Sequence, residues 1–309
     1  MKEQIIEEIE TLRRKIDEID NSILDLLNRR AEIVIEIGKI KANYNQDFYV
    51  PAREREIYER LMSKNKGPFP TEAIKSVYRE ILSASLALEK PMRIAFLGPK
   101  ATFTHVACIN RFGLSAEYIM ARGIPEVFDI VERGGADFGV VPVENSTEGV
   151  VNHTLDMFLE SQLKICGEIL LEVSHDLLSK TGRPQDIRRI YSHPHAIAQC
   201  RKWLENNMPN IPVIDVASTA TAAQMAAEDS QSAAIASEFA GLLYDLKVVY
   251  KRIEDNINNY TRFLVIGKKI PGRTGKDKTS ILFSVKDEVG ALYRMLEPFA
   301  KNNINLTKI

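Results

Sequence analysis

The chain has 309 residues, of which 45% are hydrophobic and 27% charged, with a formal net charge of -1 at pH 7. This length allows two or more domains with their own cores, and the near-neutral charge argues against a nucleic-acid or membrane-surface role. The three cysteines lack Cys-x-x-Cys spacing, which fits a reducing compartment better than a disulfide framework. The N-terminus has no apolar signal core, and no apolar run approaches the roughly 20 residues of a membrane span. We therefore expect a cytoplasmic protein that binds neither nucleic acid nor membrane.

Residues 1–42 are predicted to form one long helix. Apolar residues recur at three- and four-residue steps from Ile5 to Leu27, no proline interrupts the segment, and Gly38 is its only glycine. This is the pattern of an amphipathic helix, about 60 Å long at 1.5 Å per residue. A single helix of this length must bury its apolar stripe against another element, so we expect a bundle or a dimer.

Two shorter helices are predicted next, over residues 51–64 and 71–90. Pro51 suits the first turn of a helix, and Thr71 is expected to cap the third helix with its hydroxyl group. Pro91 then closes the all-helical region.

Several charged residues of this region fall on shared helix faces. Arg30 and Lys41 are eleven residues apart, which places them on one face, and Ser85 and Glu89 form an i,i+4 pair. Arg13 lies about 25 Å from Arg30 along the axis, at 1.5 Å per residue, so the two cannot hold one small molecule within a single chain. Each charge taken alone fits a solvated surface residue. If Arg13 is functional, it serves a partner subunit in an antiparallel arrangement.

As a set, these residues resemble the all-helical chorismate mutases over residues 5–90. The resemblance is carried by Leu-Arg-Arg-Lys-Ile-Asp at 12–17, Leu-Leu-Asn-Arg-Arg at 26–30, Gly-Lys-Ile-Lys at 38–41 and Pro-Ala-Arg-Glu-Arg-Glu at 51–56. It implies a dimer of intertwined three-helix chains that rearranges chorismate to prephenate. That reaction needs a compact substrate conformer and charge stabilisation at the breaking ether oxygen, and no nucleophile or proton transfer.

The resemblance also implies a role for each polar residue. Arg13 of one subunit and Arg30 of the other hold the two carboxylates, and Lys41 and Glu89 point at the ether oxygen. The remaining implied contacts are Arg53 as a support, Glu54 at the ring hydroxyl and Ser85 at a carboxylate.

Two positions depart from the pattern of this family. Some members carry an Asp near Val50, so fewer contacts to the ring hydroxyl are expected here. Others carry Gln at the position of Glu89. A carboxylic acid donates a hydrogen bond to the ether oxygen only when it is protonated, so we predict that mutase activity falls as Glu89 ionises, unless Lys41 compensates.

The hydrophobic pattern changes after Pro91. Residues 93–97 are predicted to form a strand that turns at Gly98-Pro99 into a helix from about Thr104. Further apolar strands are expected near 138–143, 164–171, 188–192, 212–217, 233–236 and 261–267, with helical patterns between most of them. This alternation predicts a mainly parallel α/β domain, and the basic segment 268–278 is expected to be a linker.

Polar groups gather at the ends of several of these predicted strands, where α/β proteins usually bind small anions. Each such segment taken alone is also compatible with an ordinary strand–turn–helix connection. His193 and His195 lack a third ligand at useful spacing other than Cys200, so no metal site is predicted. No Gly-x-Gly-x-x-Gly motif follows a strand, which disfavours a nicotinamide enzyme. The sequence therefore predicts no cofactor.

Read together, five motifs resemble the prephenate dehydratases over residues 93–267. They are Gly-Pro-x-x-Thr-Phe-Thr at 98–104, Pro-x-Glu-Asn-Ser at 142–146, Ser-His-Pro at 192–194 followed by Gln199, Ser-Thr-Ala-Thr-Ala at 218–222, and Asn-x-Thr-Arg-Phe at 259–263. The resemblance implies two α/β lobes, like a periplasmic binding protein, with the site in the cleft between them. The implied reaction is loss of the ring hydroxyl and carbon dioxide from prephenate to give phenylpyruvate.

By the same resemblance, Thr261 assists the departing hydroxyl. An alcohol is a poor acid, so we favour a hydrogen-bond donor whose acidity Arg262 raises. The implied carboxylate and ring contacts are Thr102, Asn145, Ser146, Ser192 and Ser218. His195 departs from the family, in which Gln is common after His-Pro.

Residues 279–309 resemble the first half of an ACT regulatory domain, with an expected strand at 279–285, a helix at 290–302 and a strand from 304. In this enzyme family the domain binds phenylalanine at a dimer interface and inhibits. Gly290, Ala291 and Leu292 match the binding loop. The family's next segments do not follow in this sequence, which leaves phenylalanine feedback open.

The sequence therefore predicts a multidomain protein with a three-helix chorismate mutase domain (1–90), a two-lobed α/β dehydratase domain (91–270) and a partial α+β ACT domain (279–309). The predicted function is bifunctional catalysis in phenylalanine biosynthesis by a homodimer or higher homo-oligomer, with chorismate and prephenate as substrates. Two alternatives stay open. The α/β domain could be a non-catalytic ligand sensor fused to a mutase, or a dehydratase that prefers arogenate.

Overall fold

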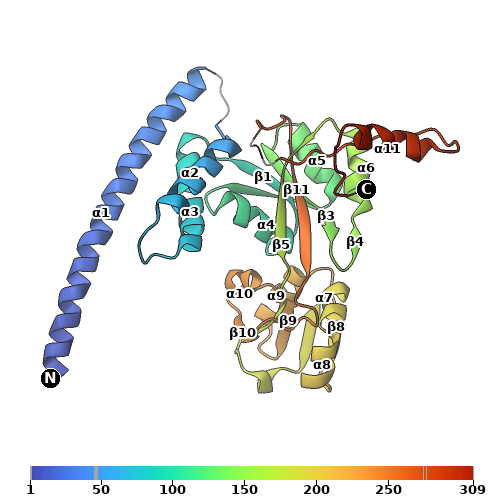
Figure 1. Cartoon of the computed structure of the whole chain (residues 1–309). Helices are drawn as coiled ribbons and strands as arrows, with labels where there is room; N and C mark the ends of the chain where they lie inside the picture. The colour runs from blue at the N-terminus through green and yellow to red at the C-terminus, as the bar shows by residue number, and fades with distance from the viewer. Residues whose placement is uncertain (1, 45–47, 274, 276, 309) are drawn as a thin grey trace. The chain divides into compact units, whose positions relative to one another are not determined.

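The computed structural model describes residues 2–44, 48–273, 275 and 277–308. The chain divides into two compact units, residues 1–273 and 274–309, and each is described by itself. The first unit holds three helices followed by two α/β lobes (Figure 1). No described helix has the length and apolar character that crossing a membrane requires.

The three predicted helices are confirmed as α1 (Lys2–Asn43), α2 (Pro51–Lys64) and α3 (Thr71–Glu89). Only the C-terminal part of α1 is packed, because Val34 and Gly38 are its buried residues. Its N-terminal half stands away from the other elements in Figure 1 and exposes the apolar stripe. The expected cap of α3 is wrong, since Pro70 occupies the capping position and the Thr71 hydroxyl accepts a hydrogen bond from Asn65 instead.

The first lobe is built on a mixed sheet with the strand order β2-β1-β3-β11-β5 and with β4 beside β3. The strands are β1 (Arg93–Leu97), β2 (Glu117–Ala121), β3 (Phe138–Asn145), β4 (Gly149–Val150), β5 (Lys164–Glu172) and β11 (Tyr260–Gly267). Its helices are α4 (Phe103–Phe112), α5 (Ile124–Glu132) and α6 (Asn152–Glu160). Helix α4 packs on one face of the sheet, and α5 packs on the other with α6 beside it.

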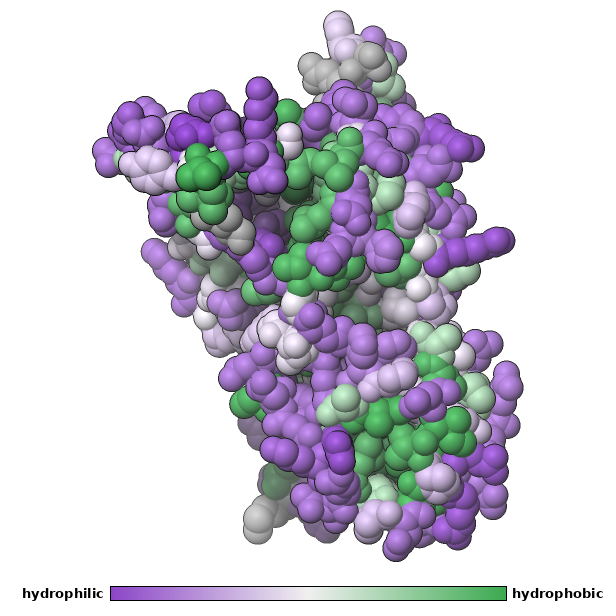
Figure 2. All heavy atoms as spheres, turned by 90° about the vertical axis from the view of Figure 1, so that its right-hand side faces the viewer, coloured by the Kyte–Doolittle hydropathy of each residue, from purple (hydrophilic) through white to green (hydrophobic). Residues whose placement is uncertain are grey.

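The second lobe is built on a five-stranded sheet with the order β10-β6-β9-β7-β8. Its strands are β6 (Asp176–Ser179), β7 (Arg189–Ser192), β8 (Val213–Asp215), β9 (Ser232–Ala236) and β10 (Lys247–Tyr250). The helical elements are η1 (Pro184–Asp186), α7 (Pro194–Gln199), α8 (Arg201–Asn207), α9 (Thr219–Glu228) and α10 (Glu238–Leu243). The alanine-rich α9 packs closely on β9, and Figure 2 shows apolar side chains among the polar ones on the outer face of this lobe.

The lobes are joined by two chain crossings, from β5 to β6 and from β10 back to β11. Strand β11 therefore returns to the first sheet, where it pairs antiparallel with both β3 and β5. The expectation of a mainly parallel domain is wrong, because β6 also pairs antiparallel with β9 and β10. Strands β2, β4, β6 and β10 were not predicted. The six predicted apolar strands after β1 are confirmed within a few residues.

The second unit contains α11 (Ala291–Lys301), which confirms the predicted helix. The predicted strands are not formed in the described residues 279–285 and 304–308, and Ile309 lies outside the described part. A strand needs a hydrogen-bonded neighbour, and the described part of this unit supplies none. The side chains of Ile281 and Leu282 are accordingly 58% exposed.

Candidate active sites

A cavity of about 330 Å³ lies between the two lobes of the first unit. Thr102, Asn145 and Thr261 reach it from the first lobe, and Ser218 and His195 reach it from the second. Four of the predicted dehydratase residues are thus brought together, although they are spread over about half of the chain.

Asn145 and Thr261 are held opposite each other by the register of β3 and β11. The Asn145 Oδ1 atom accepts the backbone N–H groups of Thr147 (2.9 Å) and Glu148 (3.1 Å), which fixes the orientation of the amide. Its Nδ2 atom then donates to Thr261 Oγ1 (2.8 Å) and to Asn259 Oδ1 (3.1 Å). Because the Thr261 oxygen already accepts a hydrogen bond, its own proton is left to donate elsewhere.

This hydrogen-bond network continues into the second lobe. Asn259 Nδ2 donates to Gln199 Oε1 (2.9 Å), and Gln199 Nε2 donates to Thr147 Oγ1 (3.2 Å). His175 Nε2 lies 2.8 Å from the same Gln199 oxygen and therefore donates to it. Burial lowers the pKa of His175, which keeps its ring neutral. These hydrogen bonds link the two lobes beside the cavity.

Two helix N-termini supply positive potential at the cavity. Thr102 caps α4 by accepting the His105 N–H group, and Ser218 caps α9 by accepting the Thr221 N–H group at 2.9 Å. Both capping residues line the cavity. No Lys or Arg is found among its described lining residues. An anion there would interact mainly with hydroxyl groups, amides and helix dipoles.

Three predicted dehydratase residues lie away from the cavity. Ser192 is fully buried and donates to the Ile235 carbonyl oxygen at 2.7 Å. Ser146 Oγ accepts the Tyr260 N–H group at 3.0 Å, so it holds the turn next to Asn145. Both hydroxyl groups thus make hydrogen bonds within the protein, and their predicted substrate contacts stay predictions.

Arg262 also lies away from the cavity. Neighbouring residues of a strand point to opposite faces, and Arg262 pairs there with Glu144 (3.1 Å) and Glu168 (3.3 Å). It is not a lining residue of the cavity that contains Thr261. This arrangement gives no support to the prediction that Arg262 raises the acidity of Thr261.

Sequence reasoning also missed the cavity residues Phe103 and His175. Their rings meet edge to face with centroids 5.4 Å apart. His175 lies between two strands and belongs to no recognised motif, so no local pattern could have identified it. His195, in contrast, was noted, and its Nδ1 atom lies 2.8 Å from Glu148 Oε1 of the other lobe.

The helical region gathers a second polar cluster between α1 and α3. Lys41 Nζ lies 2.8 Å from Glu89 Oε2, and the Glu89 side chain is only 7% exposed. Arg30 donates to the Ser85 hydroxyl group, which in turn donates to a backbone carbonyl. A Cβ atom at Gly38 would lie 3.1 Å from Glu89 Cγ, so the glycine allows the two helices to approach here.

Two predicted mutase residues lie apart from this cluster. Arg13 is exposed near the N-terminal end of α1, where it pairs with Glu10 at 2.6 Å. Arg53 is also exposed and pairs with Glu56 at 2.7 Å. Within one chain, Arg13 and Arg53 therefore lie apart from Arg30 and Lys41.

Glu54 faces the first lobe instead of the Lys41–Glu89 pair. It accepts hydrogen bonds from Tyr49 and Tyr58, both at 3.1 Å, and lies 3.5 Å from Arg111 of α4. Arg111 also donates to the Tyr49 hydroxyl group at 2.7 Å. Burial raises the pKa of both tyrosines, so their hydroxyl groups stay protonated. Glu54 thus joins the helical region to the first lobe, and its predicted contact with the ring hydroxyl stays a prediction.

In the second unit, Gly290 has a φ of 78° and precedes the first residue of α11. Ala291 begins the helix, and Leu292 is 57% exposed. The left-handed conformation suits glycine, and these three residues form the loop-to-helix turn at the start of α11.

The geometry of the first unit is therefore that of a protein with two separate candidate sites for small molecules. One is a charged cluster on helices, and the other is a cleft between two α/β lobes whose lining is mostly uncharged and includes the Glu148–His195 pair. Both suit small organic acids, because each combines several fixed hydrogen-bond donors.

Comparison with known proteins identifies the family. The family model described as prephenate dehydratase matches residues 94–271, and the one described as chorismate mutase type II matches residues 12–90. The bifunctional chorismate mutase/prephenate dehydratase of Aquifex aeolicus is 53% identical over 308 residues, covering 98% of this chain and 85% of the relative. Its counterpart in Pseudomonas aeruginosa is 43% identical over 309 residues, with the same coverage.

A solved structure agrees for the lobes. The prephenate dehydratase of Arthrobacter aurescens in complex with L-Phe has a TM-score of 0.61 and 33% identity, covering 71% of this chain and 75% of that one. The chain belongs to the family of bifunctional chorismate mutase/prephenate dehydratases. Both resemblances stated from the motifs are thereby confirmed at the level of the family.

Proposed function

We propose that the chain carries out both activities of its family in phenylalanine biosynthesis. The helical cluster rearranges chorismate to prephenate, and the cleft converts prephenate to phenylpyruvate. The observation that carries the second assignment is the amide of Asn145, which holds the oxygen of Thr261 as an acceptor and leaves its proton for the substrate.

In the cleft, Thr261 donates a hydrogen bond to the ring hydroxyl of prephenate. The bond between the ring and its carboxylate breaks to release carbon dioxide, and the electron pair enters the ring as the hydroxyl group departs. The ring becomes aromatic, which drives the step. A hydrogen bond that strengthens as negative charge develops on the departing oxygen lowers the barrier.

The capped ends of α4 and α9 bind the carboxylates of the substrate. Thr102 and Ser218 line the cavity beside N–H groups at these helix starts. A dipole holds an anion without a counter-charge that would have to be desolvated. Asn145 uses both amide hydrogens within the protein, so we give it a positioning role and no substrate contact.

In the mutase site, Arg30 and Ser85 hold one carboxylate while Lys41 and Glu89 act at the ether oxygen. Arg13 comes from a second chain, whose α1 also covers the exposed apolar stripe. This proposal rests on the exposed side chains of Ile9, Leu12 and Ile16 and their neighbours, which no described element covers. Arg53 supports the site from α2.

The domain limits, location and regulation are part of the proposal. We place the mutase at 1–90, the dehydratase at 91–270 and an ACT segment at 279–309, in a cytoplasmic homodimer or higher homo-oligomer. The solved relative from A. aurescens holds L-Phe. We propose that phenylalanine is an effector of this chain at Gly290–Leu292.

A coupled assay tests the proposed function. Supplied with chorismate alone, the protein should form prephenate and then phenylpyruvate. A mutase fused to a sensor would stop at prephenate, and an arogenate dehydratase would turn over arogenate faster than prephenate. Either result would contradict the proposed dehydratase activity.

A further inference from the structure

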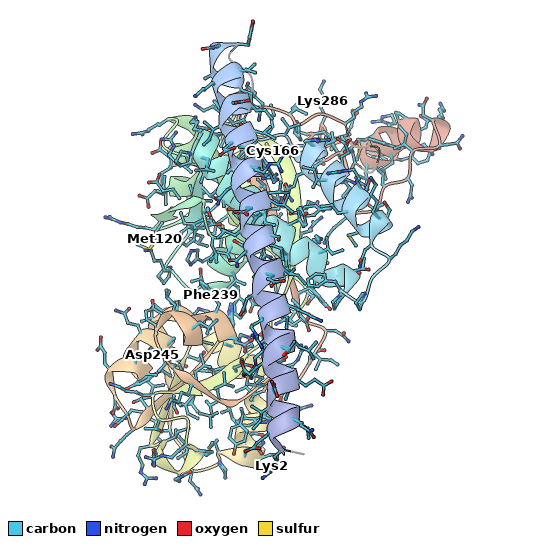
Figure 3. The ribbon with its side chains drawn as sticks, turned by 90° about the vertical axis from the view of Figure 1, so that its left-hand side faces the viewer. Lys2, Met120, Cys166, Phe239, Asp245 and Lys286 are labelled. Carbon is cyan, nitrogen blue, oxygen red and sulfur yellow. The ribbon has the colours of Figure 1, made fainter. Side chains whose placement is uncertain are left out.

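A second cavity, of about 500 Å³, lies where the three helices meet the first lobe. Its wall on the helical side includes Phe48 and Leu86, and its wall on the lobe side includes Phe112 and Phe138. Cys166, labelled in Figure 3, also lines it. The cavity shares no lining residue with the cleft around Thr261.

The charges around this cavity are unbalanced. Its described lining contains one acidic residue, Asp137, and five basic residues: Lys90, Arg93, Arg111, Lys268 and Lys269. Lys90 and Arg93 share Asp137, each at 3.6 Å, which is too long for a strong hydrogen bond. Lys268 has no ion pair within the described part of the chain, and its Nζ atom would lie 3.6 Å from a Cβ at Gly134. Two cations therefore share a single carboxylate, and a third, Lys268, lies beside Gly134 with no ion pair in the described chain.

The remaining lining is apolar and aromatic. Lys90 Nζ lies 5.9 Å from the centre of the Phe48 ring, and the Phe112 and Phe138 rings stack with centroids 6.1 Å apart. A ligand that suits both parts has an unsaturated ring for the aromatic wall and a carboxylate for the surplus cations. The volume fits a single ring with a short side chain.

We propose that this junction cavity is a further binding site, specific for a small carboxylate with an unsaturated six-membered ring. Lys268 and Lys90 bind the carboxylate, and the rings of Phe112 and Phe138 contact the body of the ligand. The described lining of the cavity contains none of the residues assigned to the two reactions, although it adjoins the mutase cluster, where Lys41 Nζ donates to the Phe48 carbonyl oxygen at 3.1 Å.

The cavity can be changed in two independent ways. The substitution Lys268→Gln removes one cation and keeps most of the side-chain length. The substitution Gly167→Leu fills the cavity, and a Cβ there would meet nothing closer than Val265 at 3.9 Å, so the strand should tolerate it. Lys180→Gln, at an exposed position in the other lobe, is the matched control.

Binding of 3-phenylpropanoate to the full chain, measured by isothermal titration calorimetry, tests the proposal. Lys268→Gln should weaken binding about tenfold, the loss expected for one charge-assisted hydrogen bond, and Gly167→Leu should abolish it. Lys180→Gln should bind as the wild type does. The proposal is overturned if the wild type does not bind, or if binding is unchanged in both cavity variants, since the probe would then occupy another site. Thermal melting of each variant confirms that it is folded.

Discussion

The two catalytic regions of this chain handle organic acids in different ways. The helical cluster relies on two cations, Arg30 beside Ser85 and Lys41, whose Nζ atom lies 2.8 Å from Glu89 Oε2. The cleft has no Lys or Arg in its described lining and combines hydroxyls, amides and the starts of α4 and α9 with one carboxylate, that of Glu148. A rearrangement with no proton transfer is helped by charges placed at the breaking bond. The loss of a hydroxyl group instead needs a donor whose direction is fixed.

The regions also differ in completeness. The cleft is closed within one chain, because β11 returns to the first sheet and brings Thr261 opposite Asn145. The helical cluster is open, because Arg13 lies far along an α1 helix whose N-terminal half is unpacked. This difference supports our proposal that the dehydratase works within one chain and that the mutase site is shared between two.

The largest expected effect is that of Thr261→Ala on the dehydratase. Loss of a hydrogen-bond donor to a developing anion costs about 100- to 1,000-fold in kcat, whereas the mutase should stay within about twofold because the sites are separate. Thr261→Ser keeps the hydroxyl group and should retain most of the turnover. Equal loss of both activities in the alanine variant would indicate a folding defect and contradict the assignment.

Complementation tests whether the mutase site is shared between chains. Arg13→Ala and Arg30→Ala should each reduce mutase activity by about 100-fold, since each removes a charge-assisted contact to the substrate. Mixed and reassembled, the two variants should recover up to about a quarter of wild-type activity, because half of the dimers then carry one intact site. No recovery in verified mixed dimers would show that both arginines act in one chain.

A smaller effect is expected from Gly38→Ala. The added Cβ would lie 3.1 Å from Glu89 Cγ and push α1 from α3, at a cost of about 1–3 kcal/mol for overpacking. Mutase KM and kcat should both worsen, while dehydratase constants stay unchanged. Gly67→Ala, where a Cβ meets nothing within 4 Å, is the control. An unaltered mutase in the Gly38 variant would mean that this close approach is not needed.

The last expected effect, which leaves both activities aside, is a pH dependence of the free energy of unfolding. Burial lowers the pKa of His105 from 6.5 to about 4, so between these values the unfolded chain binds more protons than the folded one. Stability should therefore be complete above pH 6.5 and fall as the pH drops towards 4, by at most about 1.4 kcal/mol per pH unit from this group. His105→Asn, which does not titrate, should show a shallower slope in urea denaturation between pH 5 and 7. An identical slope would assign the pH dependence to other groups.

The sequence was informative where structure is local. The period of the apolar residues predicts α1, α2 and α3, and short β-branched runs predict most of the strands. The motifs also identify Asn145 and Thr261. Their hydrogen bond, however, joins residues 116 positions apart through a strand that returns from the second lobe, and no periodicity encodes that pairing.

Other errors were of different kinds. The orientation of Arg262 follows from the alternation of a strand, so the correct prediction was available from the sequence. The surroundings of Glu54 could not be predicted from the sequence, because they depend on Tyr49 and Arg111, which approach from outside the helix. The strands expected in residues 279–308 do not form, because a strand needs a neighbouring strand for its hydrogen bonds and the described part of this unit has none.

The central claim is that Asn145 acts through Thr261, by orienting its hydroxyl group as a donor. Asn145→Asp keeps the oxygen that accepts the turn N–H groups and removes the amide hydrogens, so the Thr261 proton would turn towards the new carboxylate. The decisive measurement is dehydratase kcat at saturating prephenate for Asn145→Asp, Thr261→Ala and the double variant. Saturation separates kcat from the rise in KM that the added charge causes. We predict that the double variant is no slower in kcat than Thr261→Ala alone. Independent, multiplicative losses would contradict the account.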